Sequence, residues 1–235
     1  DRIPNGATLQ IGVGRIPDAV GNLLDGHKDL GVHTEMFSVS LMNLMKKGVI
    51  NNSRKSLKPG KTVFAFAGGQ RATQEIYDFV DNNPDIEMNP ISWVNDPYVV
   101  AELTNFISIN SAIAVDLTGQ VCSESIGTTT FSGPGGQADF IRGAKLAPGG
   151  QSYILINSTG KKKDGTLFSK INLALAPGSG VTGSRADVQY IVTEYGVAEI
   201  RFRSIAERAR AMISIAHPQF REQLTYEARK AGYFI

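Results

Sequence analysis

Apolar residues in the first part of the chain form short continuous runs that alternate with segments in which they recur at helical spacing. The short runs predict β-strands, and the segments between them predict α-helices. The run from Thr62 to Ala67 is apolar on both faces, as a central parallel strand would be. The expected strands are Ala7 to Gly12, Leu30 to His33 and Thr62 to Ala67, and the expected helices are Asp18 to Leu24, Met36 to Gly48 and Thr73 to Asn82.

The same alternation continues to the end of the chain. Asp96 stands where an acidic N-cap would begin a short helix, and the lysine-bearing stretch from Ser158 to Gly165 is typical of a solvated hairpin tip. No linker or repeat interrupts the series, so we expect one α/β domain with a mostly parallel sheet flanked by helices. The expected strands are Pro90 to Asn95, Ser108 to Leu117, Tyr153 to Asn157 and Val188 to Thr193, and the expected helices are Pro97 to Asn105, Ser204 to Ala216 and Pro218 to Ala231.

Composition is that of an ordinary globular protein. Of 235 residues, 42% are apolar and 20% are charged, and the net charge is only +2. That balance favours neither a nucleic acid nor a membrane as partner. The single cysteine, Cys122, excludes an intrachain disulfide framework and suits a reducing compartment, so we expect the protein in the cytoplasm. No apolar run reaches the roughly 18 residues of a transmembrane helix.

A glycine-rich turn, Gly12-Val13-Gly14, follows the first expected strand. Such turns are common in α/β folds for steric reasons alone, and this is the more frequent explanation. The functional alternative is that the turn directs backbone N–H groups and a helix N-terminus at an anion or a carbonyl oxygen. Because the third glycine and the lysine of the standard nucleotide motifs are missing, a dinucleotide or triphosphate site is disfavoured.

A second loop, Thr128 to Gln137, has three threonines followed by Gly133, Gly135 and Gly136. This composition makes a poor core element and exposes backbone amides. Such amides can stabilise a developing oxyanion when they lie about 3 Å from it. The alternative is a simple surface turn.

Glu35 is the carboxylate with the most suggestive setting, among apolar and hydroxyl neighbours and just before an amphipathic segment. A lone glutamate is more often a solvated residue or the acid of a helix's first turn. His33 would share a face with Glu35 if the strand continues and could orient it, although a lone histidine is more often structural. Glu124 is the competing carboxylate.

Other candidates for chemistry are weaker. Asp96 and Asp139 have the positions of helix caps. Cys122 has no convincing base nearby in the sequence, so an inert buried thiol is expected. The three histidines are too dispersed to predict a metal site.

Together these segments resemble the acetyl-CoA hydrolase/transferase family, and within it the 4-hydroxybutyrate and butyrate:acetate CoA-transferases. The segments that carry the resemblance are Gly12 to Val20, Gly31 to Met36, Asp116 to Glu124, Gly135 to Phe140 and Val192 to Glu199. The resemblance implies a CoA-transferase-like (NagB/RpiA-like) α/β fold. Family members have about twice this length in two similar domains. Residues 1–235 are therefore expected to be the C-terminal catalytic domain, without the family's N-terminal domain.

The resemblance also implies a reaction. Glu35 would be the nucleophile that attacks an acyl-CoA thioester, forms a mixed anhydride, becomes a glutamyl-CoA thioester and is released by an acceptor carboxylate. Backbone donors of Gly135 and Gly136 would stabilise the tetrahedral oxyanions. Coenzyme A is then substrate and carrier, and no permanently bound cofactor or metal is expected.

Family position further implies the contacts to CoA, and Asn110 is suited to hydrogen bonds with amides of the pantetheine arm. The chain departs from the family where many relatives have Asp-Gly in place of Val39-Ser40, next to the expected nucleophile. It also has Arg201-Phe202-Arg203 in place of Arg-Gly-Lys. The expected CoA-binding residues are Ile11, Gly12, Val13, Gly14, Arg15, Asn110, Gly133 and Gln137.

Two alternatives to a transferase stay open at this point. One is an acetyl-CoA hydrolase that admits water to the same glutamyl intermediate, and the other is an inactive CoA-binding domain. The expected partners are acyl-CoA, a small carboxylate, the missing N-terminal domain and further copies of the full-length protein. Neither a nucleic acid nor a membrane is expected.

Overall fold

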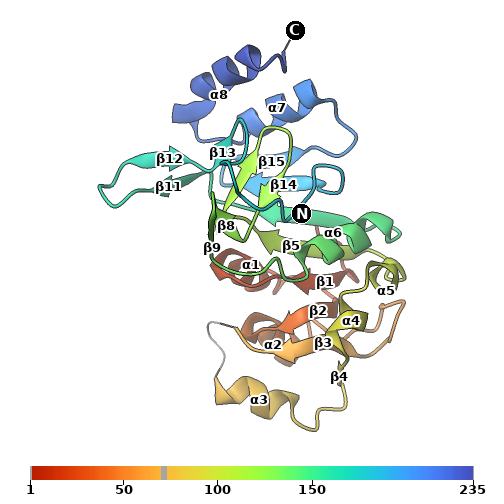
Figure 1. Ribbon diagram of the computed structural model, residues 1–235. Helices are drawn as coiled ribbons and strands as arrows, with labels where there is room; N and C mark the ends of the chain where they lie inside the picture. The colour runs from red at the N-terminus through yellow and green to blue at the C-terminus, as the bar shows by residue number, and fades with distance from the viewer. Residues whose placement is uncertain (1, 70–72, 235) are drawn as a thin grey trace. The chain divides into compact units, whose positions relative to one another are not determined.

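The computed structural model describes residues 2–69 and 73–234, and these residues divide into two compact units. The first unit comprises Asp1–Asn110 and Asp139–Ser152, and the second comprises Ser111–Ala138 and Tyr153–Ile235. Figure 1 shows α/β architecture in both units. The prediction of a mostly parallel sheet flanked by helices is confirmed.

A parallel sheet with strand order β5-β1-β2-β3-β4 forms the centre of the first unit. Its central strands are buried along almost their whole length, because helices cover both faces of a parallel sheet. The strands are β1 (Thr8–Ile11), β2 (Gly31–Phe37), β3 (Thr62–Ala67), β4 (Ile86–Met88) and β5 (Phe106–Ser111).

Helices α1 and α2 pack against each other, while α4 contacts β2 and β3. The aromatic rings of Phe106 on β5 and Phe140 on α6 stack at 6.2 Å, and Gly143 of α6 lets Val100 of α5 approach closely. These contacts build a core on the face that carries α4 and α5. The helices are α1 (Arg15–Gly21), α2 (Val39–Lys46), α3 (Gln74–Val80), α4 (Ile91–Val94), α5 (Pro97–Ala101) and α6 (Gln137–Leu146), the last of which enters the first unit at Asp139.

The second unit has β10 (Gln151–Leu155) parallel to β14 (Tyr190–Thr193), with β15 (Gly196–Glu199) antiparallel at the edge. Helices α7 (Ile205–Ser214) and α8 (Pro218–Lys230) follow. Ser204 caps α7 in a capping box with Glu207. The shorter strands are β6 (Ala114–Asp116), β7 (Val121–Cys122), β8 (Ser125–Ile126), β9 (Thr129–Thr130), β11 (Thr159–Lys161), β12 (Leu167–Ser169) and β13 (Ile171–Asn172).

Most predicted elements are present, including the hairpin whose tip was expected between Ser158 and Gly165. The strand predicted at Pro90 to Asn95 is wrong. Pro90 has no N–H for a ladder, and its carbonyl accepts from the N–H groups of Trp93 and Val94, so a helical turn forms instead. The strand predicted from Ser108 to Leu117 is two strands, β5 and β6.

The strand predicted at Leu30 to His33 is too short, because β2 continues to Phe37 and includes Glu35. The helix predicted from Met36 accordingly begins only at Val39, after an extended Ser38. Periodicity could not locate this boundary, since Met36 and Phe37 fit the apolar pattern of either element.

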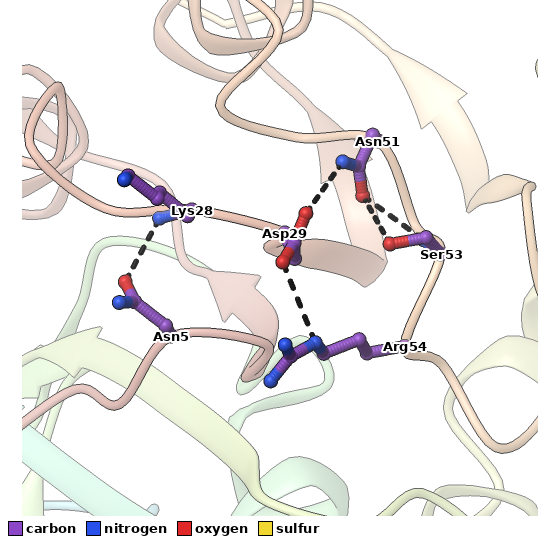
Figure 2. A network of polar contacts seen from close by, with 6 residues as sticks. All are labelled: Asn5, Lys28, Asp29, Asn51, Ser53 and Arg54. Carbon is purple, nitrogen blue, oxygen red and sulfur yellow. Dashed lines mark hydrogen bonds and ion pairs between the residues drawn. The ribbon is translucent and has the colours of Figure 1, made fainter.

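The loops before β1 and β2 are fixed by a network of polar contacts (Figure 2). The Asn5 side chain accepts from the Lys28 N–H at 2.8 Å. Asp29 accepts from Asn51 at 2.9 Å and pairs with Arg54 at 3.4 Å. These contacts connect the loops that lead into the amino ends of β1 and β2.

Candidate functional site

Glu35, Gly12 and Asn110 lie in one row across the carboxyl edge of the first unit's sheet. Strand β1 lies between β5 and β2, with Ile11 opposite Ile109 and Leu9 opposite Val32. Continuing this register places Gly12 between Asn110 and Glu35. Residues directly opposite each other share a face, so the side chains of Glu35 and Asn110 project on the same side of the sheet.

Gly12 allows the side chain of Asn110 to approach the backbone of the glycine turn closely. An ideal Cβ at Gly12 would lie 2.3 Å from Oδ1 of Asn110, so the amide of Asn110 lies across the glycine. Because neighbouring strands are about 4.8 Å apart, Glu35 and Asn110 are separated by about 10 Å at the backbone.

The glycine turn lies at the same edge. Ile11 ends β1, Gly14 has a left-handed φ of 129° that favours glycine, and Arg15 begins α1. Thr34 donates from Oγ1 to the Ile11 carbonyl at 3.4 Å, which connects the turn to β2. The first unit thus brings together Glu35 and the predicted CoA contacts Ile11, Gly12, Val13, Gly14, Arg15 and Asn110.

Glu35 is half-buried, and its charge acts on Asp139 of α6. Burial raises the pKa of the Asp139 carboxyl, and the charges of Glu35 and Asp96 raise it further, while Arg142 opposes them. Asp96 is an N-cap as predicted, since its carboxylate accepts from the Tyr98 N–H at 2.8 Å. The prediction that Asp139 is a cap is wrong, because α6 begins at Gln137 and Asp139 lies in its first turn.

His33 shares the face of Glu35, but its contacts are structural. Its Nε2–H donates to the Val94 carbonyl at 2.8 Å, and its ring packs against Trp93 and Phe106. Burial lowers the pKa of His33 from 6.5 to about 4, so the ring is neutral at pH 7. Nδ1 has no hydrogen-bond partner among the described residues. These contacts favour the structural interpretation over a role in orienting Glu35.

The second glycine loop belongs mainly to the second unit. Its threonines form part of the β8–β9 hairpin, which turns at Gly127 with a φ of 56°. Residues 131–135 are exposed, Gly136 is buried, and Nε2 of Gln137 is buried with no hydrogen-bond partner among the described residues. The roles of Gly133, Gly135, Gly136 and Gln137 stay predictions.

Glu124 and Cys122 have local structural contacts in the second unit. The Glu124 carboxylate accepts from Thr182 at 3.2 Å, and its backbone carbonyl accepts from Phe131. Cys122 is buried, and its thiol lies 3.2 Å from the Ser125 carbonyl. Both sets of contacts are typical of residues that support a loop, and not of reactive groups.

Three buried polar residues were missed from sequence: Gln10 and Ser108 beside Asn110, and Lys55 at the amino end of β2. Gln10 and Ser108 bond to Asn110, and Lys55 donates to the carbonyls of Val32 at 2.8 Å and Lys61 at 2.6 Å. Burial lowers the pKa of Lys55 from 10.5 to about 7. The sequence does single out Gln10, because it is a polar residue inside an otherwise apolar run. Lys55 lies in a polar stretch of the sequence, where nothing predicts that it is buried.

The two departures from the family pattern lie in different settings. Val39 and Ser40 line a small cavity of about 60 Å³ together with Asp18, Asn22 and Asn43. Phe202 has a left-handed φ of 60° and its side chain is 88% exposed. A residue with a Cβ is strained there, which explains why glycine suits this position.

No group of three or more His, Cys, Asp or Glu that could hold a metal ion occurs within residues 2–69 and 73–234. In the same part of the chain, no helix is long and apolar enough to cross a membrane.

Comparison with known proteins adds independent information. The sequence model of the acetyl-CoA hydrolase/transferase C-terminal domain matches residues 72–228. The 4-hydroxybutyrate coenzyme A transferase of Clostridium kluyveri is 52% identical over 229 residues, which are 97% of this chain and 52% of that protein. The butyryl-CoA:acetate CoA-transferase of Anaerostipes caccae is 46% identical over 98% of this chain and 52% of its own length. The crystal structure of RipA from Yersinia pestis matches with a TM-score of 0.91 and 41% identity, covering 100% of this chain and 51% of that one.

The fold and the row at its strand edge define an α/β protein with a carboxylate on the strand next to a glycine turn. The chain belongs to the acetyl-CoA hydrolase/transferase family, as the resemblance implied. It spans about half the length of the curated relatives that it matches.

Proposed function

We propose that the protein to which this chain belongs is an acyl-CoA:carboxylate CoA-transferase of the EC 2.8.3 type. It would exchange CoA between a short-chain acyl-CoA, such as acetyl-, butyryl- or 4-hydroxybutyryl-CoA, and a free carboxylate. The observation that carries the proposal is the row of Glu35, Gly12 and Asn110 at one strand edge. The names of the relatives, which are CoA-transferases, support the same reaction class.

Glu35 would act as the nucleophile. Its carboxylate oxygen attacks the thioester carbonyl carbon, the C–S bond breaks, and a mixed anhydride and CoA thiolate result. The thiolate attacks the glutamyl carbonyl and releases the first carboxylate, which leaves a glutamyl-CoA thioester. An acceptor carboxylate reverses the sequence and regenerates Glu35. The half-buried position of Glu35 supports this role, because partial removal of water and a fixed strand favour attack.

Backbone N–H groups of Gly135 and Gly136 would donate to the tetrahedral oxyanions of each step. The pantetheine arm would contact the Ile11 to Arg15 turn and Asn110, and Gly133 and Gln137 would make further contacts to CoA. CoA is a substrate in this scheme, so no permanently bound cofactor takes part. We further propose that the protein is cytoplasmic, requires an N-terminal domain and assembles into homo-oligomers. Light scattering of the full-length protein would measure its oligomeric state.

Replacement of Glu35 tests the function. In the full-length protein, Glu35→Gln should abolish transfer and prevent a CoA mass adduct on the peptide that contains residue 35, because an amide cannot form the anhydride. Glu124→Gln is the matched control, since its carboxylate bonds to Thr182, and it should retain transfer and the adduct. Full activity of Glu35→Gln would exclude this mechanism.

An acetyl-CoA hydrolase is the second candidate, because the family name includes both activities. It would use the same glutamate and admit water to the glutamyl thioester. Assay of acyl-CoA without a carboxylate acceptor separates the two: a hydrolase continues to release CoA, whereas a transferase stops after one equivalent. An inactive CoA-binding domain would bind CoA in calorimetry and release none.

A further inference from the structure

Asn5 and Gly6 form the one Asn-Gly pair of the sequence, in the loop that leads into β1. In such a pair the backbone nitrogen of glycine can attack the side-chain amide carbon of asparagine, because glycine has no side chain to obstruct the approach. The new C–N bond closes a succinimide ring, and ammonia leaves. Water then opens the ring at either carbonyl, which yields aspartate or isoaspartate. Asn5-Gly6 is therefore chemically able to deamidate.

Lys28 engages both reacting groups of this pair through its backbone. The Gly6 N–H donates to the Lys28 carbonyl at 2.9 Å, and the Lys28 N–H donates to Asn5 Oδ1 at 2.8 Å (Figure 2 shows the latter). Attack requires that the Gly6 nitrogen lose its proton and approach the Asn5 amide carbon. Gly6 is buried with this proton in a hydrogen bond, and the Asn5 amide is held at Lys28. The folded loop therefore opposes the reaction at both groups.

Further contacts of the same network hold the backbone at Lys28 and cover Gly6. Asp29, the next residue after Lys28, accepts from Asn51 at 2.9 Å and pairs with Arg54 at 3.4 Å (Figure 2). The stem of Arg54 lies against Gly6, since an ideal Cβ built on Gly6 would be only 2.6 Å from Arg54 Cδ. Arg54 thus shields the Gly6 backbone from water and base, and it also restrains the segment that makes both bonds.

We propose that Asn5-Gly6 is a latent deamidation site, which Lys28 and Arg54 keep unreactive in the folded protein and which reacts with water when this loop opens. Opening of one loop costs less free energy than global unfolding, so otherwise folded molecules react. The aspartate product keeps an oxygen that can accept from the Lys28 N–H. The isoaspartate product adds a methylene group to the backbone, so both bonds to Lys28 cannot re-form in their present geometry. Isoaspartate therefore accumulates in molecules whose loop has opened.

The experiment compares deamidation of the full-length protein in its folded and unfolded states. Peptide mass spectrometry measures aspartate and isoaspartate at position 5 during incubation at mildly alkaline pH, in buffer and in guanidinium chloride. Asn5 should deamidate at least ~100-fold faster in the unfolded protein, because only opened loops react in the folded one. Hydrogen exchange at the Gly6 N–H should be slow in the folded protein for the same reason. Equal deamidation rates in the two states would overturn the proposal.

Arg54→Ala tests the shielding directly. It uncovers Gly6 and releases Asp29, so deamidation of the folded protein should become at least ~5-fold faster than in wild type. Lys47→Ala is the matched control, because it removes an exposed cation that pairs with Asp25 at 2.6 Å, and it should leave the rate unchanged. An unchanged rate in folded Arg54→Ala, or an equal acceleration in Lys47→Ala, would overturn the proposal. If Arg54→Ala failed to fold, the comparison of folded and unfolded wild type would still decide, since equal rates or no product in either state would refute a latent site.

Discussion

His33 should make the protein acid-sensitive well above the range in which carboxylates titrate. The neutral ring is 0% exposed and donates to the Val94 carbonyl. Burial lowers the pKa of His33 from 6.5 to about 4, so the unfolded chain binds more protons than the folded chain between these values. The free energy of unfolding should therefore fall as the pH decreases from about 6.5 to about 4. His33→Gln removes the titration and keeps an N–H that can donate to Val94.

The magnitude follows from the two pKa values. Each pKa unit corresponds to about 1.4 kcal/mol, so the full effect of His33 below pH 4 is about 3 kcal/mol. Between pH 7 and pH 5 the unfolded histidine becomes protonated while the folded one stays neutral, which amounts to about 2 kcal/mol. His33→Gln should be less stable than wild type at pH 7, and this deficit should shrink by about 2 kcal/mol at pH 5.

Urea unfolding followed by circular dichroism at both pH values measures these differences. Taking the difference between wild type and variant cancels the titration of the other groups. Phe64→Leu is the control, because Phe64 is also 0% exposed, stacks on Phe37 and does not titrate. Its deficit should be the same at pH 7 and pH 5. If the deficit of His33→Gln were also the same at both, burial of a neutral His33 would not be the source of acid sensitivity.

Three further substitutions test other parts of the structure. Gly12→Ala adds a methyl group 2.3 Å from Asn110 Oδ1 and should lower kcat/KM for acyl-CoA at least ~10-fold, whereas Gly26→Ala, with nothing within 4 Å, should not. Equal activities of the two variants would contradict a role of the Gly12 turn in binding acyl-CoA. Phe202→Gly should raise the free energy of unfolding by about 1 kcal/mol, because it relieves a φ of 60°, and a lower value in urea unfolding would contradict this strain. Lys55 has a folded pKa of about 7, so its proton is lost earlier in the folded state and stability should rise by about 2 kcal/mol from pH 7 to pH 9. Lys55→Met should remove that rise in urea unfolding, and an unchanged rise would assign it to other groups.

Hydrophobic patterning predicted the alternation of strands and helices but not every boundary. The strand at Thr62 to Ala67 and the capped helix after Asp96 were predictable because their signals are local. The helix at Ile91–Val94 was not, since four apolar residues fit either element. Its conformation depends on Pro90 and on the His33 bond to the Val94 carbonyl, which is a contact between residues far apart in sequence.

The candidate site was only partly predictable for the same reason. Glu35 was selected by resemblance, because a single glutamate has no local signal of function. That Glu35, Gly12 and Asn110 share a row follows from strand order and register, which depend on tertiary packing and not on spacing. Gln10 was visible as a polar residue in an apolar run, but its partner Ser108 is 98 positions away.

The buried Lys55 has a chemical consequence for a protein that handles activated acyl groups. An amine with a pKa of about 7 is about half unprotonated at neutral pH, and unprotonated amines attack thioesters and anhydrides. In the folded chain this nucleophile is out of reach, since Lys55 is 4% exposed and its ammonium group is held by two carbonyls. In the unfolded chain it is accessible, but its pKa returns to 10.5 and almost every copy is protonated. Lys55 is therefore protected from acylation in both states, by shielding in one and by charge in the other.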